Sequence, residues 1–160
     1  MTIGVGDTMP AGEFRVMGAN GPEKITTDSL FSGKKVVLFA VPGAFTPTCS
    51  IKHLPGYVES AAALRAKGVD TVACMAVNDV FVMSAWGQSG NVGDDVVMLS
   101  DGNGAYAKSL GLDLDLSGSG MGIRAKRFSM IVDDGVVTQL NVEPPGEFGV
   151  SSAETALGQL

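Results

Sequence analysis

Short apolar runs alternate with longer mixed stretches along most of the chain. Three runs are bounded by Gly, Pro, Asn or Asp, as is typical of strands buried in a sheet: residues 35–41, 69–77 and 95–100. Helices are predicted between and after them, over about 48–66, about 80–86 and 104–110. We expect an interruption of the first helix near Pro55-Gly56, because proline has no N–H to donate.

Two hairpins flank this strand–helix series. Residues 14–17 and 23–26 are predicted to form a hairpin around Gly18-Ala-Asn-Gly-Pro22, and residues 127–142 turn at Asp133-Asp-Gly135. Asp28 is predicted to cap a short helical turn, and Ser151 with Glu154 to form the capping box of a last helix. The order predicts an α/β fold with a mixed central β-sheet flanked by helices, and residues 1–160 as a single domain.

Composition and charge narrow the function classes. The 160 residues are 45% hydrophobic and 18% charged, which is typical of a globular protein. A net charge of −6 argues against binding nucleic acid or an anionic membrane surface. Two cysteines and one histidine cannot supply a four-ligand zinc site or a disulfide scaffold. No apolar run reaches the ~20 residues of a membrane helix, and the start lacks a signal-peptide pattern, so we expect a cytosolic protein.

The segment between the first apolar strand and the following helix carries the candidate chemistry. It reads Val41-Pro-Gly-Ala-Phe-Thr-Pro-Thr-Cys-Ser50, which places Cys49 in the first helical turn. Free backbone N–H groups and the positive end of the helix dipole favour a thiolate there. Thr46 brings a hydroxyl three residues upstream. The alternative is a buried structural cysteine, the usual role of an isolated one.

The same segment, followed by His53-Leu-Pro-Gly56, resembles the peroxidatic motif of peroxiredoxins, and in particular of their type II, or peroxiredoxin-five, branch. Three later stretches resemble the same branch in the same order: 72–79 with Trp86 downstream, 126–130 and 140–144. The resemblance implies a thioredoxin-like fold with an N-terminal β-hairpin extension. It also implies a thiol-dependent peroxidase that reduces hydrogen peroxide and organic hydroperoxides without a metal, flavin or haem.

The resemblance also implies a role for each matching residue. Cys49 matches the peroxidatic nucleophile, Thr46 the hydroxyl that bonds thiolate and peroxide, and Pro42 the residue that shields the pocket. Arg127 matches the arginine that contacts both thiolate and peroxide, where a permanently charged, forked donor is suited to growing negative charge. The expected partners are a hydroperoxide, glutathione with glutaredoxin or thioredoxin as reductant, and a second copy in a homodimer near Trp86.

Several alternatives stay open at the level of sequence. His53, four residues after Cys49, could form a Cys–His dyad of a thiol hydrolase or instead bond a backbone carbonyl. Cys74 could be a core residue of its strand or a resolving cysteine. Animal members of the branch carry a resolving cysteine before the last helix, where this chain has Gly149-Val-Ser-Ser152. A peroxide sensor or holdase is a further, non-enzymatic reading of a reactive Cys49.

Two remaining patterns in the sequence are interpreted as having no functional role. The glycine-rich stretch 116–122 lacks the last glycine of a dinucleotide fingerprint, because Ile123 occupies that place, and is predicted to be a loop. Asp113 and Asp115 are predicted to lie on a solvated face.

Overall fold

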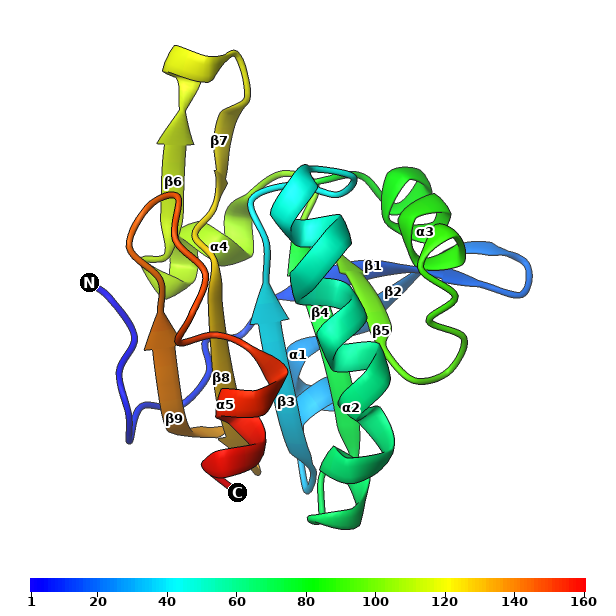
Figure 1. The fold of residues 1–160 in the computed structure, drawn as a ribbon, viewed down its shortest axis with the longest axis vertical. Helices are drawn as coiled ribbons and strands as arrows, with labels where there is room; N and C mark the ends of the chain where they lie inside the picture. Colours follow the sequence, from blue (N-terminus) through cyan, green and yellow to red (C-terminus); the bar gives the residue numbers. More distant parts are fainter.

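A computed structural model describes residues 1–160 and places seven strands in one mixed sheet (Figure 1). In spatial order the strands are β2 (Gly21–Thr26), β1 (Glu13–Gly18), β5 (Val97–Ser100), β4 (Thr71–Ala76), β3 (Lys35–Ala40), β8 (Phe128–Asp133) and β9 (Val136–Val142). The central β3, β4 and β5 are parallel, whereas β8 runs antiparallel to β3. The predicted series of parallel crossovers followed by an antiparallel pair is confirmed.

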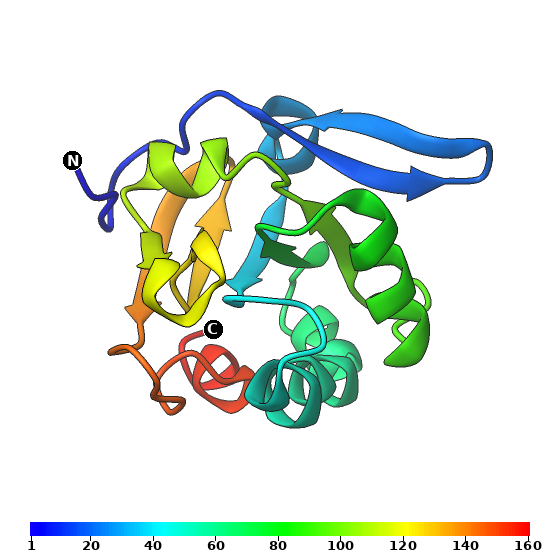
Figure 2. The ribbon, with the colours of Figure 1, turned by 90° about the horizontal axis from the view of Figure 1, so that it is seen from above.

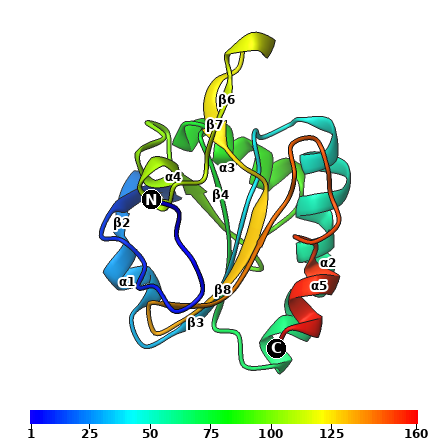
Figure 3. The ribbon, with the colours of Figure 1, turned by 90° about the vertical axis from the view of Figure 1, so that its left-hand side faces the viewer.

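Helices cover both faces of the sheet. The helices are α1 (Thr27–Phe31), α2 (Leu54–Ala66), α3 (Val80–Ser89), α4 (Ala105–Leu110) and α5 (Ala153–Gly158). Figure 2 and Figure 3 show α2 and α5 on one side of the sheet and α1 and α4 on the other. The expected sheet flanked by helices is therefore confirmed.

The two faces of β3 supply two separate hydrophobic clusters. Val36 and Leu38 pack with α1 and α4, while Val37 and Phe39 pack with α2, α3 and α5. Successive side chains of a strand point to opposite faces, so a strand covered on both sides is apolar at every position. Cys49 and Cys74 both belong to the cluster on the α2 side.

The N-terminal hairpin extends the sheet at one edge. β1 and β2 pair antiparallel along their full length, and β1 joins β5 through Arg15 and Ser100. The hairpin projects well past the body of the molecule (Figure 2). At the other edge, Asp134 and Gly135 both have positive φ, of 48° and 81°, which is the two-residue turn that the Asp-Gly pair predicts.

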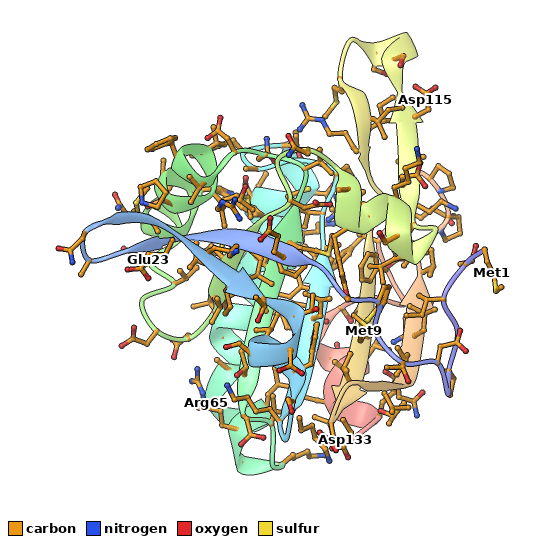
Figure 4. The ribbon with its side chains drawn as sticks, turned by 180° about the vertical axis from the view of Figure 1, so that it is seen from behind. Met1, Met9, Glu23, Arg65, Asp115 and Asp133 are labelled. Carbon is orange, nitrogen blue, oxygen red and sulfur yellow. The ribbon has the colours of Figure 1, made fainter.

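A third hairpin is missing from the sequence-based interpretation. Residues predicted as a loop lie between β6 (Asp113–Leu116) and β7 (Gly122–Ala125), which pair antiparallel outside the main sheet. Asp113 to Leu116 alternates polar and apolar residues, but four-residue strands give a weak periodic signal. The hairpin stands away from the body at the top of Figure 1, and Figure 4 shows Asp115 on it. Asp115 is solvent-exposed as predicted, and Asp113 is half-buried.

Two predicted helix caps and one predicted helix interruption lie at neighbouring residues instead. Thr26, rather than Asp28, caps α1 by accepting a hydrogen bond from the Ser29 N–H. Ser152, rather than Ser151, caps α5, because the Ser151 hydroxyl is engaged elsewhere. The helix is not broken at Pro55, which is accepted in the first turn of α2; the irregularity lies just before it.

No helix of the structure combines the length and the apolar composition that crossing a membrane requires.

Candidate active site

The site begins where β3 ends. The chain leaves the sheet at Val41, makes a loop, and becomes helical at Pro47, so Cys49 lies in the first turn as predicted. The loop is tied to the next crossover, because the Ala44 N–H donates to Asn78 Oδ1 at 2.9 Å. Asn78 follows β4, so the carboxyl ends of two parallel strands together position the loop that carries the cysteine.

Residues Cys49–His53 form one wide π turn rather than a regular α-helical turn. The Leu54 N–H donates to the Cys49 carbonyl five residues back, immediately before Pro55, which has no N–H. Single π turns inside helices are frequent at functional sites. Trp86 holds the turn from the side, since its Nε1–H donates to Ser50 Oγ at 3.0 Å.

Two donors converge on the Cys49 sulfur. Thr46 Oγ1 lies 2.8 Å and Arg127 Nη2 lies 3.0 Å from Sγ, which is fully buried. Thr46 Oγ1 also lies 2.7 Å from the Gly43 carbonyl, and a hydroxyl has only one proton to give. It therefore donates to Gly43 while it accepts from a thiol, or donates to a thiolate sulfur.

Arg127 is held by a histidine rather than by a carboxylate. Its Nη1 lies 2.9 Å from His53 Nδ1, and a guanidinium can only donate, so Nδ1 must accept. The proton of the neutral ring is therefore on Nε2, which lies 3.0 Å from the Ser151 carbonyl. Burial, together with the Arg127 charge, lowers the pKa of His53 from 6.5 to about 3, so the ring is neutral at physiological pH.

A buried carboxylate fixes the far end of this chain of contacts. Glu143 Oε2 accepts from the Gly149 N–H at 2.7 Å, the Ser151 N–H at 2.8 Å and the Ser151 hydroxyl at 2.7 Å. Burial raises the pKa of Glu143, but these hydrogen bonds outweigh it and the pKa lies below its usual value. The Ser151 carbonyl also accepts from Tyr57 Oη at 2.9 Å, so the backbone at Ser151 is held from two sides.

A small cavity of about 100 Å³ adjoins the cysteine. Pro42, Thr48 and Arg127 are among the residues that line it, and Arg127 also contacts the Cys49 sulfur; the shielding role of Pro42 stays a prediction. A larger cavity, of about 690 Å³, lies between β1, α3 and β5 and is lined by none of the predicted site residues. No group of three or more His, Cys, Asp or Glu side chains is placed to hold a metal ion.

The predicted site residues lie together, but two alternatives lose support. Both ring nitrogens of His53 are engaged by Arg127 and Ser151, and none bonds Cys49, which does not fit a Cys–His dyad. Cys74 is a free, fully buried thiol in β4, and burial raises the pKa of that thiol. The sequence interpretation missed Glu143 and Ser151, and it missed the contact of His53 with Arg127.

The buried neutral His53 makes a specific contribution to acid sensitivity. The unfolded chain binds a proton at this residue below about pH 6.5, but the folded chain binds it only below about pH 3. Stability from this source is therefore complete above pH 6.5 and is lost as the pH falls toward 3, by about 1.4 kcal/mol per pH unit. We expect His53→Gln to flatten the decline in unfolding free energy between pH 6.5 and 4, measured by urea titration. A decline as steep as that of the wild type would contradict this assignment.

Comparisons with known proteins agree with this site. Residues 4–157 match the family model described as Redoxin. Peroxiredoxin-2B of Arabidopsis thaliana is 49% identical over 159 residues, which cover 99% of this chain and 98% of that protein. The chloroplastic Peroxiredoxin-2E-2 of Oryza sativa subsp. japonica is 52% identical over 164 residues, which cover 99% of this chain and 73% of that protein.

A solved structure is equally similar. The crystal structure of reduced Prx3 from Vibrio vulnificus in complex with H2O2 has a TM-score of 0.95 at 51% identity, and the match covers 99% of each chain. This neighbour confirms the thioredoxin-like fold, and the names of the plant relatives are consistent with the type II branch. This chain belongs to the redoxin family and is a peroxiredoxin, a thiol peroxidase.

Proposed function

We propose that Cys49 is the peroxidatic nucleophile of this peroxiredoxin, and that hydrogen peroxide and organic hydroperoxides are its substrates. The observation that carries the proposal is the convergence of Thr46 Oγ1 and Arg127 Nη2 on one buried sulfur. The thiolate attacks one peroxide oxygen, the O–O bond breaks, and the second oxygen leaves as water or an alcohol after taking a proton. Sulfur is oxidised by two electrons to the sulfenic acid, and the peroxide is reduced by two.

Thr46 and Arg127 act on the charge that moves during this step. Negative charge starts on the sulfur and grows on the departing oxygen, so donors fixed near both atoms lower the barrier more than they lower the ground state. The neutral His53 fits this role of Arg127, because it orients the guanidinium without cancelling its charge. Pro42 lines the cavity next to Arg127, and we assign to it the shielding of that side of the pocket.

Reduction of the sulfenic acid is assigned to an external thiol, either glutathione with glutaredoxin or thioredoxin. Cys74 is the nearest internal candidate, but it is fully buried and paired in register with Phe39 of β3. A disulfide needs the two Cα atoms within about 7 Å and suitable Cβ directions, and Cys74 is held in the ladder between β3 and β4, which limits its movement toward Cys49. A soluble thiol has no such constraint.

A homodimer is proposed through the face that carries the Phe45 loop and α3. Phe45 and Phe81 are exposed by 54% and 64%, although large aromatic side chains are normally buried. Phe45 also has a φ of 64°, a strained value for a bulky residue, which persists only where the surroundings impose it. Exposed aromatic residues beside an active-site loop fit an interface between two copies.

The cytosol is the proposed compartment. Both cysteines are free thiols, which a reducing compartment maintains. The rice relative is named as a chloroplastic protein, whereas the name of Arabidopsis Peroxiredoxin-2B gives no compartment. Imaging of a fluorescent fusion in the source cell would decide between these locations.

Cys49→Ser is expected to abolish peroxide consumption, because a hydroxyl is a far weaker nucleophile than a thiolate. The measurement is the rate of peroxide loss with excess thiol, with circular dichroism to show that the fold is retained. Turnover in this variant would disprove the assignment of Cys49.

Arg127→Lys is expected to lower the rate of the peroxide step by roughly 10²–10³-fold, or about 2.7–4 kcal/mol in the barrier, the usual effect of losing one fixed oxyanion donor. A lysine keeps the charge but loses the fork that reaches both Sγ and His53. Stopped-flow oxidation of Cys49 measures this step alone. A rate near that of the wild type would rule out a role for the fork.

Cys74→Ser is expected to keep near-normal turnover with glutathione and glutaredoxin, because the external thiol supplies the second sulfur. Mass spectrometry after one equivalent of peroxide should show a mixed disulfide on Cys49 when glutathione is present. A variant that stalls after one turnover, together with a Cys49–Cys74 bridge in the wild type, would assign Cys74 as the resolving residue.

Phe81→Glu is expected to shift the protein toward monomer, because it buries a charge in the proposed interface. Sedimentation velocity at micromolar concentration in reducing buffer measures the change. Ile123→Glu, which alters an exposed apolar residue on β7, is the matched control and should remain dimeric. A monomeric wild type would contradict the interface.

A further inference from the structure

The cavity beside Cys49 is lined by two opposite charges that the protein itself does not pair. Lys126 and Glu147 both line it, yet neither side chain forms an ion pair in the structure. Glu143 lines the same cavity, but the carboxylate is engaged by Gly149 and Ser151. A half-buried lysine and an exposed glutamate therefore line one small space without an ion pair between them.

Lys126 differs from its basic neighbours. Arg124, Lys126 and Arg127 are three of the 11 basic residues of a chain with a net charge of −6. Arg124 donates to the carbonyls of Met121 and Val77, and Arg127 donates to Cys49 and His53. Lys126 alone of the three has no internal acceptor for its side chain, so its charge is available to a ligand.

The two charges come from backbone segments that are fixed separately. The Lys126 N–H donates to the Leu112 carbonyl at 2.8 Å, just before β8 begins. The Glu147 N–H donates to the Pro144 carbonyl at 3.0 Å, in the loop between β9 and α5. Only the end of that loop reaches the first turn of α2, where the Ser151 carbonyl accepts from Tyr57 Oη. Neither charge lies in the π turn of Cys49, so both stay in place if that turn opens to expose the buried sulfur.

We propose that this cavity is a subsite for the α-amino acid head of a small thiol of the glutathione type, with Lys126 binding the α-carboxylate and Glu147 the α-ammonium. The inference rests on the proposed formation of a sulfenic acid at Cys49. Hydrogen peroxide carries neither charge and the hydroperoxide group itself is neutral, whereas an amino acid thiol carries an ammonium and a carboxylate on one carbon. The cavity volume of about 100 Å³ equals that of roughly three water molecules, which suits such a head and is too small for a protein segment.

The first step of the reaction that this subsite would serve needs only glutathione and the Cys49 sulfenic acid. The glutathione thiolate attacks the sulfur of the Cys49 sulfenic acid, an S–S bond forms, the S–O bond breaks, and hydroxide leaves and becomes water. The Cys49 sulfur is reduced and the glutathione sulfur is oxidised. A second thiol then attacks the glutathione sulfur, which releases Cys49 as a thiolate and completes the cycle.

The test compares thiols on preformed Cys49 sulfenic acid in the whole protein. Stopped-flow rate constants are measured for glutathione, for glutathione acetylated on its α-amino group, for cysteamine, which lacks the carboxylate, and for uncharged dithiothreitol. The readout is the ratio of each rate constant to that of dithiothreitol, which cancels general changes in the exposure of Cys49. The protein variants are Lys126→Gln and Glu147→Gln, with Lys108→Gln and Glu59→Gln as controls at exposed positions that line no part of the cavity.

We expect Lys126→Gln and Glu147→Gln each to lower the glutathione ratio about threefold to fivefold, the usual size for a solvent-accessible charge pair. The Glu147→Gln effect should disappear with acetylated glutathione, and both effects should weaken at high salt. The two control variants should keep the wild-type ratio.

Three results would overturn the subsite. One is an unchanged glutathione ratio in both variants, and another is an equal fall in the control variants. The third is that glutathione reduces the wild-type Cys49 sulfenic acid no faster than dithiothreitol does, although a dithiol protein reduces it rapidly. Failure of the proposed function is distinguishable, because no sulfenic acid would then be trapped at Cys49 after peroxide addition.

Discussion

The site depends on one guanidinium that is shared between a sulfur and an imidazole. Arg127 donates from one nitrogen to Cys49 and from the other to His53, so its plane is fixed by two contacts at the two ends of one π turn. An arginine partnered by a carboxylate would have much of its charge neutralised locally. Here the partner is a neutral ring, so the full positive charge faces the sulfur and the cavity beside it. His53 thus fixes the position of the guanidinium and leaves the positive charge of that group unneutralised.

The neutral ring needs support of its own, which explains the buried polar chain behind it. His53 can accept from Arg127 only if its proton is on Nε2, and the Ser151 carbonyl selects that tautomer. Ser151 is in turn held by Glu143 through its N–H and its hydroxyl. Every buried side-chain nitrogen and oxygen of the structure has a hydrogen-bond partner. In a low-dielectric interior, a hydrogen-bonded network in which every group has a partner is rigid, whereas an unpartnered group in it would lower the stability of the fold.

The sequence predicts the parts of this site that are local, and misses those that are distant. Thr46 and Cys49 are three residues apart in one loop, so their meeting follows from the strand–loop–helix pattern. Arg127 is identified from the sequence only by resemblance, because nothing in its own segment indicates a contact 78 residues away. The link from His53 to Ser151 spans 98 residues and gives no sequence signal. The same limit applies to β6 and β7, whose four-residue strands pair outside the main sheet.

The buried chain also constrains where a second reactive thiol could lie. The segment before α5 is committed to the site from within, since Ser151 is fully buried and its N–H, hydroxyl and carbonyl all have partners. Ser152 caps α5 by accepting from Thr155. A thiol moving from this segment toward Cys49 would have to break the contacts that orient His53, and with them the placement of Arg127. A site built to hold Arg127 in this way therefore favours a second thiol that arrives from solvent.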